Sequence, residues 1–224
     1  MFLNSSIARK QTVATTGILL ILFIVAHLGG NLLIYAGPGV FNAYAYHLHS
    51  LGPLLWLIRF GLLAVFLVHI SLTSVIVIEN IKARGGLQRY AVEQSSGPRS
   101  LAERLMPYSG LYLLIFVIFH ILDIACVNPQ GPLSFIHGKS YGLYGLVFNL
   151  FKDPVYGLLY IMAMCFLGLH LCHGVQSVVQ TNGFRPKWAA WIKIGSDCFA
   201  LLMVVGFSSI PVYVYLLSSN YVKP

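Results

Sequence analysis

The sequence has few charged residues and very few acidic ones. Of its 224 residues, 9% are charged and six are Asp or Glu, whereas 58% are hydrophobic and the mean hydropathy is +0.79. A soluble domain carries about 25% charged and about 45–50% apolar residues. A globule of this length could not bury so much apolar surface beneath a polar coat, which excludes a soluble enzyme, a nucleic-acid binder and a disordered scaffold. The chain is therefore predicted to be an integral membrane protein.

Cysteine is also scarce, and its placement argues against disulfide or zinc chemistry. The four cysteines lie in or beside apolar runs and form no C-x-x-C pair, so we interpret them as small buried hydrophobes. The net charge of +8 comes from basic residues that flank apolar runs and form no separate domain. We therefore expect no nucleic-acid partner.

The sequence contains long apolar runs. Five of them are long enough to cross a bilayer, which takes about 20 residues. They cover Val13–Tyr35, Leu55–Ile78, Pro107–Val127, Pro154–Val179 and Trp191–Leu217. The first is too long for a signal-peptide core and lacks a following A-x-A-like site, so it is expected to be retained. Residues 1–224 are predicted to form a single all-α domain, an integral membrane bundle of five transmembrane helices. A loop with turn signals at both ends is expected at 37–53.

Basic residues predict the orientation of this bundle. Ten of the 14 Lys and Arg side chains fall on the side of the N-terminus, and four fall on the other side. The ten are Arg9, Lys10, Lys82, Arg84, Arg89, Arg99, Arg104, Arg185, Lys187 and Lys193, and the four are Arg59, Lys139, Lys152 and Lys223. By the positive-inside rule, the N-terminus is expected to be cytoplasmic and the C-terminus outside.

Five histidines lie inside the predicted spans, where an ionisable residue marks a functional site by default: His27, His69, His120, His170 and His173. At 1.5 Å per residue, His27 and His120 lie about 20 Å from the inner boundary, whereas His69 and His170 lie about 6–9 Å from it. The four sort into an outer pair and an inner pair about 13 Å apart, each drawn from two helices.

Two levels of paired imidazoles suit two bis-histidine b-type haems, because each ring takes one neutral imidazole on each face and a helix bundle can supply both. Such an iron transfers electrons and has no open position. We favour His170 over His173 as the ligand because Gly174 lies one turn beyond His170 on the same face. His173 remains an alternative ligand, a propionate contact or a packing residue. Gly30 and Gly61 are expected to leave room for the flat ring.

Several segments, taken in order, carry a resemblance that covers nearly the whole chain. They are Thr16-Gly17, Ala26–Asn31, Phe41–Ala45, Arg59–Leu63, Val68-His69, Phe119–Asp123, Gly168–Ser177 and Gln180-Thr181. In these segments the chain resembles the single-chain, di-haem cytochrome b membrane-anchor subunit of succinate dehydrogenase/fumarate reductase (succinate:quinone oxidoreductase). The resemblance implies two haem b groups whose axial ligands are His27, His69, His120 and His170.

The resemblance also implies partners and a route for electrons. A flavoprotein subunit and an iron–sulfur subunit would dock on the cytoplasmic face of a bacterial inner membrane, with Arg84, Arg89 and Arg99 as the candidate docking surface. Electrons would pass from the inner to the outer haem and then to a quinone, typically menaquinone, and no dicarboxylate chemistry would occur on this chain. The candidate contacts for quinone or cofactor are Asn31, Asn42, Tyr44, His47, His49, Arg59, Asp123, His173 and Gly174.

Proton transfer is the point where the chain departs from some of these relatives. They carry a membrane carboxylate where this chain has Gly168, so no proton route is expected there. Asp123 is the acidic residue inside a span near a proposed haem, either as a hydrogen-bond partner or as a proton acceptor at an outer quinone.

Two other functions fit the same residues. One is a haem-b quinone subunit of a hydrogenase or formate dehydrogenase, which would differ in its co-purifying partner. The other is a haem-free transporter or proton channel in which the histidines relay protons.

Overall fold

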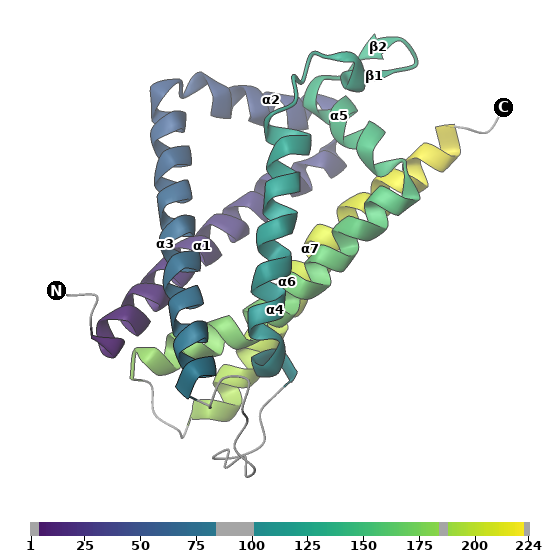
Figure 1. The fold of residues 1–224 in the computed structure, drawn as a ribbon. Helices are drawn as coiled ribbons and strands as arrows, with labels where there is room; N and C mark the ends of the chain where they lie inside the picture. Colours follow the sequence, from purple (N-terminus) through teal and green to yellow (C-terminus); the bar gives the residue numbers. More distant parts are fainter. Residues whose placement is uncertain (1–4, 84–100, 184–187, 222–224) are drawn as a thin grey trace.

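The computed structural model describes residues 5–83, 101–183 and 188–221 (Figure 1). Nearly all of this part is helical, and one short antiparallel hairpin accompanies the helices. In chain order the elements are α1 (Ser6–Leu32), η2 (Leu33–Ala36), α2 (Pro38–Ser50), α3 (Pro53–Ala83), α4 (Leu101–His120), η3 (Ile121–Ala125), η4 (Pro132–Ser134), β1 (Phe135–Ile136), β2 (Lys139–Ser140), α5 (Gly142–Phe151), α6 (Pro154–Thr181) and α7 (Ala189–Tyr221).

Five helices in the described ranges are long and apolar enough to cross a membrane. They are α1 with η2, α3, α4 with η3, α6 and most of α7. Four of the predicted spans lie entirely within one of these helices, and the third runs past the end of its helix, which stops at Ala125. The all-α fold with five candidate spans is confirmed. The side that faces the cytoplasm stays a prediction.

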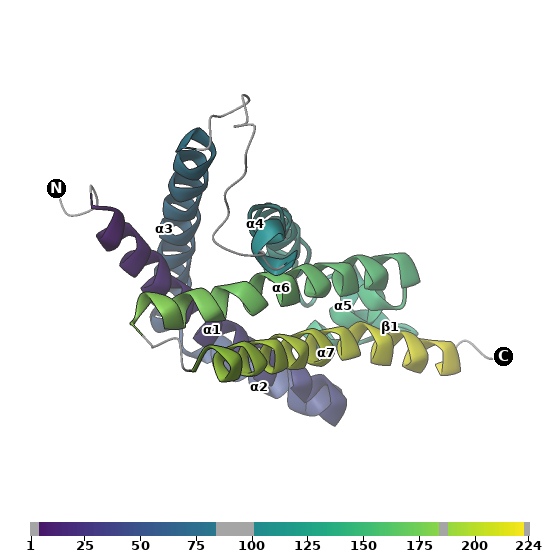
Figure 2. The same ribbon diagram turned by 90° about the horizontal axis from the view of Figure 1, so that it is seen from below.

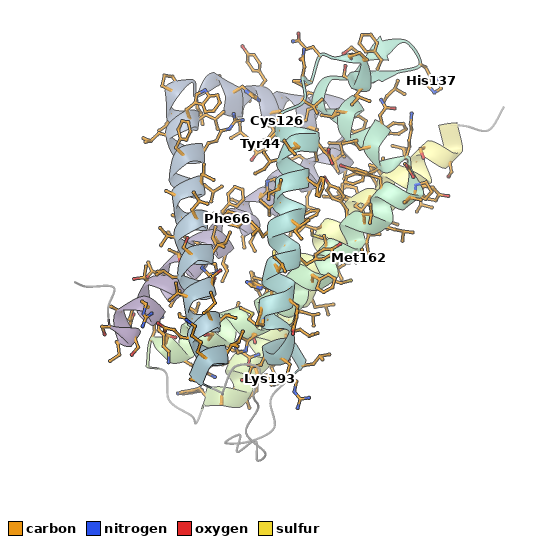
Figure 3. All side chains as sticks on the ribbon, in the orientation of Figure 1. Tyr44, Phe66, Cys126, His137, Met162 and Lys193 are labelled. Atoms are coloured by element: carbon orange, nitrogen blue, oxygen red, sulfur yellow. The ribbon has the colours of Figure 1, made fainter. Side chains whose placement is uncertain are left out.

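The two ends of the bundle differ in character. The starts of α1, α4 and α7 and the ends of α3 and α6 lie at one end, and α2, α5 and the β1–β2 hairpin lie at the other (Figure 1). Figure 3 shows Lys193 at the first end and His137 at the second. Two ion pairs lie at the first end, Arg9 with Glu79 and Lys193 with Asp197. We call the end with these two ion pairs the charged end. We call the opposite end, which α2, α5 and the hairpin cover, the capped end.

Close helix packing is concentrated on α6 and α7, which run side by side in both ribbon views (Figures 1 and 2). A Cβ added at Gly168 would lie 2.5 Å from Val204 of α7. A Cβ added at Gly206 would lie 2.8 Å from Leu28 of α1. Glycine at these two positions therefore lets the backbones approach. Any larger side chain at position 168, a carboxylate included, would have to displace Val204.

The helix α3 is packed quite differently. It lies mainly against α1, and none of its residues is buried. Large apolar side chains of α3 are exposed, for example Leu57 at 69%. In a spanning protein such a surface faces lipid, a partner or a cofactor rather than water.

The capped end has its own apolar core. Tyr144 and Phe148 of α5 are buried there with Phe41 of α2 and Val214 of α7. The side chain of Asn42 ties α2 to α5, because its Nδ2 donates to the carbonyl of Tyr141 (2.7 Å) and its Oδ1 accepts from the backbone N–H of Tyr144 (3.0 Å).

Two sequence interpretations are corrected by the fold. The segment expected to be a loop at 37–53 is the helix α2, and its turn signals mark the helix ends: Gly37 and Gly52 take φ values of 89° and 54°, and Pro38 begins the helix. The cysteines were expected to be buried, but Cys126, Cys165 and Cys198 are exposed and all four are free. These three lie on surfaces where lipid can provide the apolar surroundings that the sequence pattern indicates.

Candidate functional site

The outer histidines come from α1 and α4 and face each other. The ring centroids of His27 and His120 are 5.8 Å apart, with planes at 86°. This contact brings one imidazole from each helix to the same level of the bundle. Phe23 stacks on His27 at 5.4 Å and Phe116 stacks on His120 at 5.6 Å, so aromatic rings hold both imidazoles in place.

The inner histidines come from α3 and α6, and each is held by a hydroxyl group from a neighbouring helix. Nδ1 of His69 lies 3.1 Å from the Thr16 hydroxyl of α1. Nδ1 of His170 lies 3.3 Å from the Ser109 hydroxyl of α4. Thr16 and Ser109 each lie 11 residues before an outer histidine on their own helices, so His69 and His170 lie at a common level of the bundle.

The direction of these hydrogen bonds identifies the free ring nitrogen. A hydroxyl has one proton to donate. Thr16 donates its proton to backbone carbonyls of its own helix, at 2.8 and 3.0 Å, and Ser109 donates to the carbonyl of Met106 at 3.0 Å. With the hydroxyl proton on these carbonyls, each oxygen accepts from the histidine, an arrangement that places the ring proton on Nδ1 of His69 and His170. The neutral ring keeps a free lone pair on Nε2, the state that a metal ligand needs.

A glycine follows each of these hydroxyl residues and leaves space beside the ring. A Cβ added at Gly17 would lie 3.6 Å from Cε1 of His69. A Cβ added at Gly110 would lie 3.5 Å from Cε1 of His170. Both inner rings therefore pack on a hydroxyl–glycine pair in the adjacent helix.

A spacing shared by α1 and α4 sets the two levels. Thr16 precedes His27 by 11 residues, and Ser109 precedes His120 by 11 residues. Eleven residues are about three helical turns, so the hydroxyl and the histidine share a face and lie about 16 Å apart along the helix. Sequence reasoning identified no repeat, yet the pattern S/T-G-x9-H occurs on both helices and is the signal that could have revealed these partners.

Other predicted residues have structural roles in this geometry. Asn31 donates from Nδ2 to the backbone carbonyl of His27 at 2.7 Å. A Cβ added at Gly30 would lie 2.6 Å from the Tyr44 ring, so the space at Gly30 holds Tyr44. The expectation that Gly30 leaves room for a haem is therefore wrong. Among the described residues nothing lies within 4 Å of a Cβ added at Gly61, and a Cβ added at Gly174 would lie 3.9 Å from the Met106 side chain.

The remaining candidates are spread over the molecule. The Arg59 guanidinium lies over the Trp56 ring at 5.2 Å. His47 and His49 are exposed at the end of α2, and His173 lies within electrostatic range of His170. The predicted docking residues Arg84, Arg89 and Arg99 lie outside the described residues. Asp123 accepts a hydrogen bond from the Tyr156 hydroxyl at 2.8 Å.

The chemistry of the donor set at each level can be compared with the haem that the sequence resemblance implies. In the parts of the chain that the structure describes, no group of three or more His, Cys, Asp or Glu side chains could hold a metal ion. Paired imidazoles suit an iron whose other ligands come from a porphyrin. Nε of Arg9 is buried and has no hydrogen-bond partner among the described residues, and Arg9 lies two turns from Thr16 on the same face of α1. Such a donor suits an inner-haem propionate.

Comparison with known proteins finds no family model, no characterised protein and no solved structure that matches the chain. What the chain does must therefore be inferred from the geometry of its own residues.

Proposed function

We propose that the chain is a di-haem cytochrome b membrane-anchor subunit of the succinate dehydrogenase/fumarate reductase type. The observation that carries the proposal is the two-level arrangement of histidines on four helices. His27 and His120 face each other at the outer level, nearer the capped end. His69 and His170 lie at the inner level, and Nδ1 of each contacts a hydroxyl group. A histidine whose Nδ1 is engaged in this way presents Nε2 to a ligand, which supports a role in binding haem iron.

The residues of this chain would divide the work of holding two haem b groups. His27 and His120 would bind the outer iron, and His69 and His170 the inner one. Thr16 and Ser109 orient the inner rings, because they accept from Nδ1 and turn Nε2 away from themselves. When bound, the haems would supply one-electron transfer between the two sides of the membrane.

Orientation and partners belong to the same proposal. The charged end, with Arg9 and Lys193, would face the cytoplasm of a bacterial cell, where an iron–sulfur subunit and a flavoprotein subunit would dock and carry out the dicarboxylate chemistry. Quinone, with menaquinone as the first candidate, would react near the capped end. Asp123 lies there as a carboxylate near His120, which suits a group that receives or passes a proton.

A reduced-minus-oxidised spectrum of the purified chain tests the proposal. We expect an α-band typical of b-type haem and two haems per chain, together with co-purification of a flavin-bearing partner. A preparation without an α-band would favour the haem-free transporter and exclude the proposal. A partner that carries molybdenum or nickel would assign the chain to a different respiratory complex.

A further inference from the structure

A line of hydrogen bonds joins the outer histidine His120 to Asp123 through two tyrosines that sequence reasoning did not select. Nδ1 of His120 lies 3.3 Å from the Tyr160 hydroxyl. The Tyr160 and Tyr156 hydroxyls are 3.1 Å apart, and Tyr156 donates to Oδ2 of Asp123 at 2.8 Å. The line runs from α4 across to α6 and back to the η3 turn that follows α4.

The carboxylate fixes the direction of the whole line. The Tyr156 hydroxyl gives its one proton to Asp123, so its oxygen accepts from Tyr160. Tyr160 has then used its own proton, and its oxygen can only accept from Nδ1–H of His120. His120 therefore has the same tautomer as His69 and His170, with the lone pair on Nε2.

The local structure holds this line in place. Tyr156 and Tyr160 are one turn apart on α6, with ring centroids 5.0 Å apart. Phe116 and Phe151 pack against Tyr160 at 5.0 and 4.9 Å. Asp123 lies in a π-helical turn, closed by the bond from the N–H of Cys126 to the carbonyl of Ile121 (2.9 Å). Turns of this kind are rare and occur frequently at functional sites.

We infer that Tyr160 and Tyr156 are positioning residues that transmit the negative charge of Asp123 to His120 and so set the electron-donor strength of that imidazole toward the outer haem. This inference rests on the proposed function. A ligand histidine whose second nitrogen donates to an acceptor is a stronger base and favours the oxidised iron. Loss of the acceptor line should raise the midpoint potential of the outer haem and leave that of the inner haem unchanged.

The test is a redox titration of the purified chain, followed by its haem absorption. Tyr160→Phe and Asp123→Asn should each raise the potential of the outer component, and Tyr156→Phe should raise it by less because Tyr160 still accepts from His120. The outer component is the one that His27→Ala removes. Tyr35→Phe is the matched control. It also removes a hydrogen bond between two hydroxyl groups, that of Tyr35 with Ser209 at 2.6 Å, but this bond is not part of the line that ends at His120.

The outcomes separate this inference from the proposed function. An unchanged outer potential in both Tyr160→Phe and Asp123→Asn, in a chain that still binds two haems, overturns only the relay. An equal rise for both haems, or the same rise in Tyr35→Phe, also overturns it. A wild-type chain without an α-band overturns the relay and the proposed function together. If Tyr160→Phe leaves no outer haem to titrate, Tyr156→Phe is used in its place, and an unchanged outer potential in that variant overturns the relay.

Discussion

The Thr16 hydroxyl lies 3.1 Å from Nδ1 of His69 and also bonds to two backbone carbonyls of α1, at 2.8 and 3.0 Å. Ser109 holds His170 in the same way, from the equivalent position of α4. In each case the hydroxyl comes from a helix that also carries an outer histidine. Each of these two helices therefore contributes a ring at one level and an anchor for a ring at the other, which ties the geometry of the two levels together.

The outer pair should be separable from the inner pair by mutation. His27→Ala and His120→Ala each remove one of two opposed ligands, so we expect the haem content to fall from about two per chain to about one. His137→Ala, at an exposed histidine of the hairpin, is the control and should keep both haems. Loss of both haems from a chain whose circular dichroism remains fully helical would contradict the pairing.

The choice between His170 and His173 can be decided in the same assay. Ser109 holds Nδ1 of His170, so His170→Ala should remove the inner haem. His173→Ala should retain both α-band components, since a residue that only packs nearby or contacts a propionate leaves axial ligation intact. The reverse result would assign the ligand to His173.

The sequence was sufficient for the coarse architecture, because membrane spans follow from the length and hydropathy of single segments. It also placed His27 and His120 at one depth, since depth follows from helical rise alone. The loop expected at 37–53 was wrong because Gly37 and Gly52 terminate a helix as readily as they make turns. A glycine or proline signal shows that a secondary-structure element ends nearby, but it does not show whether a helix or a loop lies on either side.

The partners of the histidines could not be predicted, because they depend on which helices become neighbours. Tyr160 reaches His120 across a helix pair, and nothing in its own segment indicates it. The shared S/T-G-x9-H spacing marks Ser109, but it does not say which histidine Ser109 contacts. Asn42 is a second residue whose partners depend on which helices are neighbours. A polar residue near a proposed quinone was interpreted as a ligand contact, yet both ends of its amide bind backbone groups of the 141–144 segment. Whether it also contacts a quinone stays a prediction.

The hydroxyl anchors of the inner level should matter more than other hydroxyls near the same rings. Thr16→Val and Ser109→Ala leave Nδ1–H without an acceptor, and changes to such supporting partners typically cost about 10–100-fold in metal affinity. We expect faster loss of the inner haem to a competing haem-binding protein, with the outer haem retained. Thr73→Val is the control, since Thr73 binds only backbone carbonyls of α3, including that of His69 at 2.7 Å. Equal haem loss from Thr73→Val and Thr16→Val would contradict a specific anchor role.

Asn42 should contribute to stability through the joint between α2 and α5. Asn42→Ala removes the acceptor for the N–H of Tyr144 and the donor to the carbonyl of Tyr141, and each unsatisfied group costs about 1–3 kcal/mol when it is buried. We expect a lower Tm in detergent with both haems still present at low temperature. Asn182→Ala is the control, because Asn182 bonds only to the end of its own helix and is exposed. An unchanged Tm for Asn42→Ala combined with slower quinone reduction would instead favour a direct contact between Asn42 and the quinone.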